Sequence, residues 1–380
     1  MFEIFKPTPP RGDIQSQVIE WLRFPLAVLV VLIHTGCFLG SNFNLVQIPP
    51  PEAGITAHLT YHSVVAIQQI LAHISVPLFF FMSGYLYFFK TKREQFSIED
   101  YIAKTRSRIF TLLIPYIAWN ALQIIHILII AIRDGGSYDI ISLETLPHLL
   151  WDYSQWDRSY CTIFGEVQHM TGPVFLVGWF IRDLIIVCLA APAIWWLITK
   201  TKGWILLIFG LFYVTWAWPI ASGLLITTVF WFSFGALFSI KKLNFVDVFR
   251  RFKWLNLVVS IISFVVLLAN WRKEQDTWWP TIFYVTYVVS TAMVVVCFTA
   301  TLLERGKLQL RSGLGDSTYF IYLGHPFLVG YVLKFLSIMP FQGIPAWFLG
   351  VAIIVIALLC VYAFLRKYVP WTLRVLLGQK

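Results

Sequence analysis

Long apolar blocks are the strongest constraint on how this chain folds. Ten blocks lie near residues 24–39, 66–89, 109–132, 174–198, 204–219, 223–240, 254–270, 280–302, 317–337 and 345–365. Most are about 17 to 25 residues long, which is the length that a helix needs to cross a hydrocarbon core of roughly 30 Å. Only 13% of the residues are charged, against about 25% in soluble domains. The pattern predicts an all-α integral membrane protein, a bundle of about ten transmembrane helices.

The placement of positive charge predicts the orientation of this bundle. If the N-terminus is inside, the outer segments hold only four of the 29 Lys and Arg residues, two lie within spans, and the rest lie in inner segments. The positive-inside rule expects this asymmetry. The net charge of +10 therefore indicates orientation and no nucleic-acid partner. We expect both termini in the cytoplasm and one transmembrane domain over residues 1–380, with no separate soluble domain.

The first span carries a cation and an imidazole, Arg23 and His34. Their separation of 11 residues is about three helical turns, so both lie on one face, about 16 Å apart along the axis. An arginine at the inner edge suits a phosphate, and a histidine deeper in the membrane suits a general base. Alternatively, Arg23 only anchors the helix end and His34 hydrogen-bonds a neighbouring helix.

Two further segments carry polar or small residues where apolar ones are expected. The second span contains Ser83-Gly84, which allows another backbone to approach closely. The inner segment before the third span carries three cations, Lys104, Arg106 and Arg108. These cations suit either lipid headgroups or the phosphates of a nucleotide arriving from the cytoplasm.

The fourth and ninth spans also contain residues that are costly in lipid and are therefore functional candidates. Arg182 and Asp183 are adjacent, and because neighbouring helical positions diverge by about 100°, we expect them to point to different neighbours instead of simply neutralising each other. Tyr322 and His325 lie three residues apart and face one way. We expect Ser83 and these four residues to line an interior cavity.

The longest outer segment, residues 133–173, mixes acids with Trp and Tyr. Such a mixture suits either sugar binding or an interfacial cap at the level of the lipid headgroups. The sequence has no CxxC motif and no His/Cys pairing at metal-ligand spacing. We therefore expect no metal.

Taken together, these segments resemble the membrane-bound acyltransferase family 3, the O-acyltransferases of bacterial surface glycans. The resemblance covers most of the chain. It rests on Arg23–ten residues–His34, the run 76–84 (VPLFFFMSG), the basic cluster before 113–116 (LIPY), 179–183 (WFIRD), Phe234-Gly235 and 321–326 (IYLGHP).

The resemblance implies a multi-pass protein of the bacterial plasma (inner) membrane that takes an acyl-CoA, commonly acetyl-CoA, as co-substrate. The group transferred would be an acyl group other than an aminoacyl group. Its acceptor would be a hydroxyl of a cell-envelope glycan, an exported glycan or a lipid-linked sugar, as in O-acetylation of polysaccharides. By position His34 would be the catalytic base, Arg23 the essential arginine, and Arg106 and Arg108, with Lys104 beside them, the cofactor-binding cations. Beyond these ligands we expect only membrane lipids as partners.

The expected reaction is attack of the acceptor oxygen on the thioester while His34 removes its proton, with Tyr322, His325 or Arg182 stabilising the oxyanion. Acylation of His34 before transfer is equally compatible with the sequence. The competing classes are a secondary transporter and a receptor-like membrane protein without catalysis. A transporter would be favoured by inverted repeats, which the sequence does not clearly contain.

Overall fold

A computed structural model describes residues 2–8, 12–35, 52–89, 91, 96–135, 142, 144–161, 167–220, 222–270, 279–339 and 343–378. The chain divides into two compact units, each drawn from three stretches of sequence. The first unit comprises Met1–Phe79, Asn244–Glu274 and Phe283–Tyr368, and the second comprises Phe80–Leu243, Gln275–Ile282 and Val369–Lys380. The expectation of one transmembrane domain over residues 1–380 stays a prediction.

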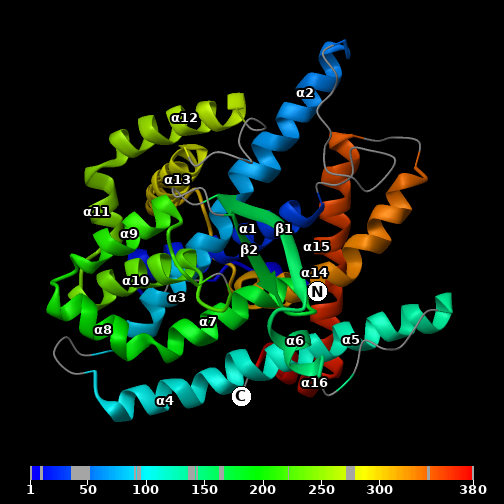
Figure 1. Cartoon of the computed structure of the whole chain (residues 1–380), viewed down its shortest axis with the longest axis horizontal. Coiled ribbons are helices and arrows are strands. Elements are labelled where there is room, and N and C mark those ends of the chain that lie inside the picture. The colour runs from blue at the N-terminus through cyan, green and yellow to red at the C-terminus, as the bar shows by residue number, and fades with distance from the viewer. Residues whose placement is uncertain are drawn as a thin grey trace. The chain divides into compact units, whose positions relative to one another are not determined.

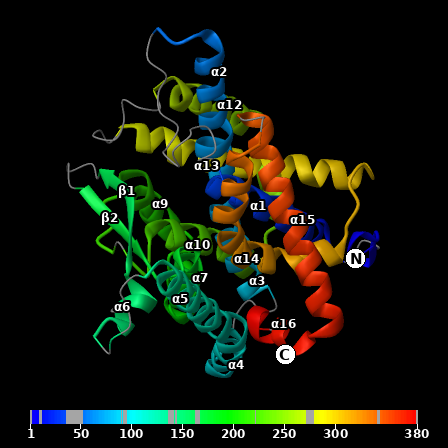
Figure 2. The same ribbon diagram turned by 90° about the vertical axis from the view of Figure 1, so that its right-hand side faces the viewer.

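The first unit is built from helices. They are η1 (Phe2–Phe5), α1 (Ile14–Thr35), α2 (Ile55–Val64), the π-helical turn η3 (Val65–Ile70), the 3₁₀ turn η4 (Leu71–Ile74), the start of α3 (Ser75–Phe88), α11 (Phe245–Arg251), α12 (Lys253–Asn270), most of α13 (Trp279–Glu304), α14 (Ser312–Ser337) and α15 (Ile344–Tyr368). Helix α1 packs along α14 and α15 (Figures 1 and 2).

Packing and a hydrogen-bond chain fix the end of α1 that carries His34. Val31 and Thr35 of α1 and Trp347 of α15 are fully buried. The indole Nε1 of Trp347 donates to Thr35 Oγ1 at 3.0 Å, and that hydroxyl donates to the Val31 carbonyl at 2.9 Å. The last turn of α1 is thereby tied to α15.

The second unit adds a small sheet to its helices. Its elements are the rest of α3, α4 (Ile98–Arg108), η5 (Ile109–Leu113), α5 (Ile114–Asp134), α6 (Leu146–Trp151), β1 (Ser154–Cys161), β2 (Val167–Gly172), η6 (Leu176–Gly178), α7 (Trp179–Leu189), α8 (Ala191–Lys200), α9 (Ile205–Thr215), α10 (Ile226–Lys241) and α16 (Pro370–Leu377). The two strands form an antiparallel hairpin. This hairpin, in the predicted outer segment 133–173, has no counterpart in the all-helical expectation.

Two glycines let α3 and α10 cross at backbone contact. A Cβ on Gly84 of α3 would lie 1.9 Å from the carbonyl oxygen of Phe232, and one on Gly235 of α10 would lie 1.9 Å from that of Phe81. Each glycine therefore faces the backbone of the opposite helix, as small residues do where membrane helices approach closely. The expected close approach at Ser83-Gly84 is confirmed.

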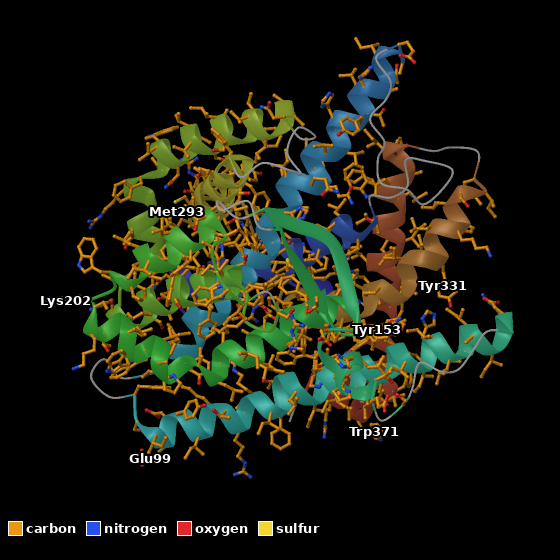
Figure 3. The ribbon with its side chains drawn as sticks, viewed as in Figure 1. Glu99, Tyr153, Lys202, Met293, Tyr331 and Trp371 are labelled. Carbon is orange, nitrogen blue, oxygen red and sulfur yellow. The ribbon has the colours of Figure 1, made fainter. Side chains whose placement is uncertain are left out.

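The helices define a multi-pass membrane protein. Seven described helices are long and apolar enough to cross a bilayer, or up to nine if each of two bent pairs counts as one span. The predicted span 204–219 contains α9, whose 11 residues rise only about 16 Å, so the count of ten stays a prediction, as does the cytoplasmic location of the termini. Charged side chains such as Glu99, in the first turn of α4, and Lys202, in the turn between α8 and α9, are exposed (Figure 3).

The glycine crossing predicts that alanine at Gly84 or Gly235 destabilises the second unit. The added methyl group overlaps a carbonyl of the facing helix and forces the helices apart, which costs about 1–3 kcal/mol. We expect a lower midpoint of thermal unfolding in detergent for Gly84→Ala and Gly235→Ala. Gly330→Ala is the control, because no atom lies within 4 Å of its added Cβ and alanine favours a helix. Equal midpoints for all three variants would contradict the crossing.

Candidate active site

Two histidines from different helices meet inside the first unit. His34 lies in the last turn of α1 and His325 in the middle of α14. Their ring centroids are 5.0 Å apart with an interplanar angle of 74°, an edge-to-face contact. His34 is half-buried and His325 is fully buried, at 0% exposure. The packing of α1 on α14 therefore creates an imidazole pair that the sequence spacing alone does not define.

The hydrogen bonds of His325 fix which of its nitrogens carries the proton. Nδ1 lies 2.7 Å from the carbonyl oxygen of Tyr322 and 3.3 Å from that of Ile321. A carbonyl only accepts, so Nδ1 donates, and in the neutral ring Nε2 holds the lone pair. Nε2 is buried and has no hydrogen-bond partner among the residues that the structure describes. His325 thus presents a buried basic nitrogen in the immediate surroundings of His34.

Tyr322 stands beside this pair on α14. It is 5% exposed, and its ring centroid lies 6.2 Å from that of His325. The expected shared face of Tyr322 and His325 is therefore realised in the structure. Whether either residue lines a substrate site stays a prediction.

Arg23 lies three turns before His34 on the same helix, in a carboxylate environment. Its guanidinium is half-buried and interacts electrostatically with Glu20, one turn earlier on α1, and with Asp316 on α14. These two carboxylates link Arg23 to both helices. A phosphate would compete with them for the guanidinium, and the predicted role of Arg23 stays a prediction.

The predicted basic cluster lies in the second unit, and its members differ in their contacts. The ammonium of Lys104 donates to the Tyr87 carbonyl at 2.7 Å and to Thr91 Oγ1 at 2.6 Å, so it holds the C-terminal end of α3. The guanidinium of Arg108 lies 5.7 Å from the centroid of the Tyr87 ring, and Arg106 is exposed. Arg106 and Arg108 therefore suit an incoming phosphate better than Lys104 does.

Arg182 and Asp183 form a buried ion pair in addition to the contacts with different neighbours that the sequence predicts. Their side chains are 2% and 0% exposed, and Arg182 Nη2 lies 3.0 Å from Asp183 Oδ1. The arginine side chain is long and flexible enough to fold back across the 100° between the two positions. That reach adds a direct contact to the separate neighbours that helical geometry predicts.

Each member of this pair also holds backbone from another segment. Arg182 donates to the carbonyls of Trp151 and, at 3.1 Å, Thr171. Asp183 Oδ2 accepts from the Leu225 N–H at 3.1 Å and from Thr228 Oγ1 at 3.3 Å. Through these hydrogen bonds the pair connects the end of α6 and the hairpin to the start of α10. Its role in lining a site stays a prediction, as does that of half-buried Ser83 at the α3–α10 crossing.

The structure sorts the ten candidate residues into two sets. The first unit holds Arg23, His34, Tyr322 and His325, and the second holds Ser83, Lys104, Arg106, Arg108, Arg182 and Asp183. Within the first unit the imidazoles and Tyr322 come together. Among the described residues no group of three or more His, Cys, Asp or Glu side chains is placed to hold a metal ion.

Sequence reasoning missed Gln68, which lies on the π-helical turn η3. It is 5% exposed, and its Nε2 donates to the carbonyl of Ile33, the residue before His34, at 2.7 Å. The signal was available, because Gln68 falls inside the predicted span 66–89, where polar side chains are functional candidates by default.

Comparison with known proteins identifies the class. The family model described as an acyltransferase domain, acyltransferase family 3, matches residues 17–366. The match includes every candidate residue above and nearly the whole chain, so the protein belongs to this family of acyltransferases. No curated protein and no solved structure matches the chain.

The Arg182–Asp183 contacts predict a large stability loss for Arg182→Met. Removing one partner strands a buried carboxylate, which typically costs about 3–5 kcal/mol. The matched control is Arg133→Met, because Arg133 pairs with its neighbour Asp134 at 2.7 Å on the surface, where a pair contributes less than about 1 kcal/mol. We expect thermal unfolding in detergent to show a much lower midpoint for Arg182→Met alone. Similar midpoints for the two variants would contradict the structural role.

Proposed function

We propose that this acyltransferase moves an acyl group, commonly acetyl, from an acyl-CoA to a hydroxyl of a cell-envelope glycan, with His34 as general base. The observation that supports the proposal most is the edge-to-face His34–His325 pair in a chain that matches an acyltransferase family over residues 17–366. An imidazole has the proton affinity that base catalysis near neutral pH requires. His34 is half-buried, so part of its side chain remains exposed.

The proposed step needs no group beyond the two substrates and the imidazole. His34 takes the proton of the acceptor hydroxyl while the oxygen attacks the thioester carbon, so that a C–O bond forms and the C–S bond breaks. The imidazolium then returns the proton to the departing CoA thiolate. An acyl-histidine route gives the same products.

The hydrogen bonds narrow the choice of oxyanion donor. The N–H of neutral His325 is already donated to the Tyr322 carbonyl, and the Arg182 guanidinium is held by Asp183 and by two carbonyls. Because the Tyr322 ring lies beside the imidazole pair, with its centroid 6.2 Å from that of His325, its hydroxyl is the oxyanion donor that we propose. His325 is then a positioning residue, whose ring orients that of His34.

The first test compares envelope glycans by mass spectrometry in cells that carry the wild type, His34→Ala or no protein. Loss of the base is expected to lower acylation at least 100-fold, the scale of general base catalysis, so the acyl mass increment should be found with the wild type alone. The control is His62→Ala, at an exposed histidine of α2, which should retain the increment. The size of the increment identifies the acyl group, and fragments that carry it narrow the acceptor.

Two outcomes would contradict the proposal. Equal acylation by the wild type and His34→Ala, at equal protein amounts, would remove His34 as the base. Identical glycan masses with and without the wild-type protein would remove the transferase function toward glycans and favour a transporter or a receptor-like protein.

The second test concerns the donor. We propose that Arg106 and Arg108 bind the phosphates of acyl-CoA, since charge-assisted hydrogen bonds to phosphate contribute about 1.5–3 kcal/mol each. The double variant Arg106→Ala/Arg108→Ala should raise the KM for acetyl-CoA at least tenfold. It should leave transfer from acetyl-pantetheine, which lacks the nucleotide, nearly unchanged.

Lys200→Ala, at an exposed lysine at the end of α8, is the control for a simple loss of positive charge. An unchanged KM for acetyl-CoA in the double variant would contradict the assignment of these arginines. An equal rise in KM with Lys200→Ala would show a general charge effect instead.

A further inference from the structure

Gln68 is placed against the last turn of α1, which carries His34, by an irregularity in the helix that precedes α3. The six residues Val65–Ile70 form a π-helical turn and the next four, Leu71–Ile74, a 3₁₀ turn, and both turns contact α1. A π turn changes the direction of the side chains around the helix axis and is common at functional sites. Here the strongly polar side chain of Gln68 is only 5% exposed and contacts the end of α1.

The hydrogen bonds settle the orientation of the Gln68 amide. Its nitrogen faces the Ile33 carbonyl at 2.7 Å, because a carbonyl accepts and does not donate. Ile33 is among the last residues of α1, whose carbonyls lack helical partners, so this bond caps the helix end that carries His34. His73 adds support, since its Nδ1 lies 3.0 Å from the Gln68 backbone carbonyl.

With the amide oriented in this way, the amide oxygen of Gln68 takes no part in the hydrogen bond to Ile33. Gln68 Oε1 is buried and has no hydrogen-bond partner among the described residues. A buried acceptor without a partner is costly, about 1–3 kcal/mol, and in a native protein it calls for an explanation such as a bound ligand. His325 Nε2 is a second acceptor in the same state.

The chemistry of the missing partner follows from these atoms. Both are neutral acceptors, so they suit an uncharged O–H or N–H group and not a phosphate. Arg23, the candidate cation of the first unit, lies three helical turns, about 16 Å, from His34. A substrate carrying such a donor group close to its reacting atom would satisfy the buried oxygen.

We propose that Gln68 is a substrate-binding residue whose Oε1 accepts a hydrogen bond from an O–H or N–H group next to the reacting carbonyl. The inference rests on the acyl transfer proposed above. Two sources have this chemistry: a second hydroxyl beside the acylated one on the glycan, and the amide N–H of the pantetheine arm nearest the thioester.

The test measures transfer kinetics and ligand-induced thermal stabilisation with purified full-length protein. The probes are acetyl-CoA and total envelope glycan from cells that lack the protein. Gln68→Met removes the hydrogen bond to Ile33 and the proposed hydrogen bond to the substrate, at nearly constant side-chain volume. Gln69→Met changes the half-buried neighbour on the same turn and serves as the matched control.

For Gln68→Met we expect about a tenfold higher KM for one probe, equivalent to about 1.4 kcal/mol, with the KM for the other probe unchanged. A higher KM for acetyl-CoA identifies the pantetheine amide, and a higher KM for glycan identifies the neighbouring hydroxyl. Gln68→Glu should restore the wild-type KM, because a neutral carboxyl still donates to Ile33 and still offers an acceptor oxygen. The unchanged KM for the other probe separates ligand binding from a defect in folding, which would affect both probes.

Three outcomes would overturn the inference. If the wild type is active and Gln68→Met keeps both KM values and both stabilisations, Gln68 does not bind substrate, while the proposed function stands. If Gln69→Met has the same effect as Gln68→Met, the effect belongs to the turn and not to the Gln68 oxygen. If the wild type neither transfers an acyl group nor is stabilised by either probe, the proposed function fails, and the inference fails with it.

Discussion

The packing of α1 against α14 is the contact on which this account of the protein depends. It brings two imidazoles edge to face at 5.0 Å, although they lie almost 300 positions apart in the chain. Backbone carbonyls of α14 orient the proton of His325, and Trp347 and Gln68 hold the last turn of α1. Three neighbouring elements thus set the position of His34: α14, α15 and the π-helical turn η3.

The buried polar side chains of this protein fall into two sets, which differ in whether their hydrogen-bonding atoms have partners. The Arg182–Asp183 pair uses its hydrogen-bonding capacity on Trp151, Thr171, Leu225 and Thr228, which is the behaviour of a structural fastening. In the first unit, in contrast, Gln68 contacts the last turn of α1 and His325 contacts His34, and a buried acceptor atom of each has no partner among the described residues. Unused buried acceptors are the better indication of where a substrate binds, because a stable fold rarely leaves such atoms without a function.

Much of the fold followed from the sequence, and the reasons for the exceptions are physical. Each apolar block contains a helix, because length and hydropathy determine what crosses a bilayer, and Gly84 does allow close contact with α10. The hairpin β1–β2 lies outside the apolar blocks, where periodicity carries no information. The direct Arg182–Asp183 contact depends on side-chain rotamers, and the direction of Gln68 depends on a π turn. Neither has a recognisable sequence signature.

The most direct test of the central claim asks whether His34 and His325 act as one unit. Initial rates of acyl transfer to envelope glycan would be measured for His34→Gln, His325→Gln and the double variant, at equal amounts of folded protein. Residues that act together give non-additive losses, so the double variant should be no slower than the slower single variant. If the two losses multiply instead, the histidines contribute independently, and the proposed positioning of the base His34 by His325 is contradicted.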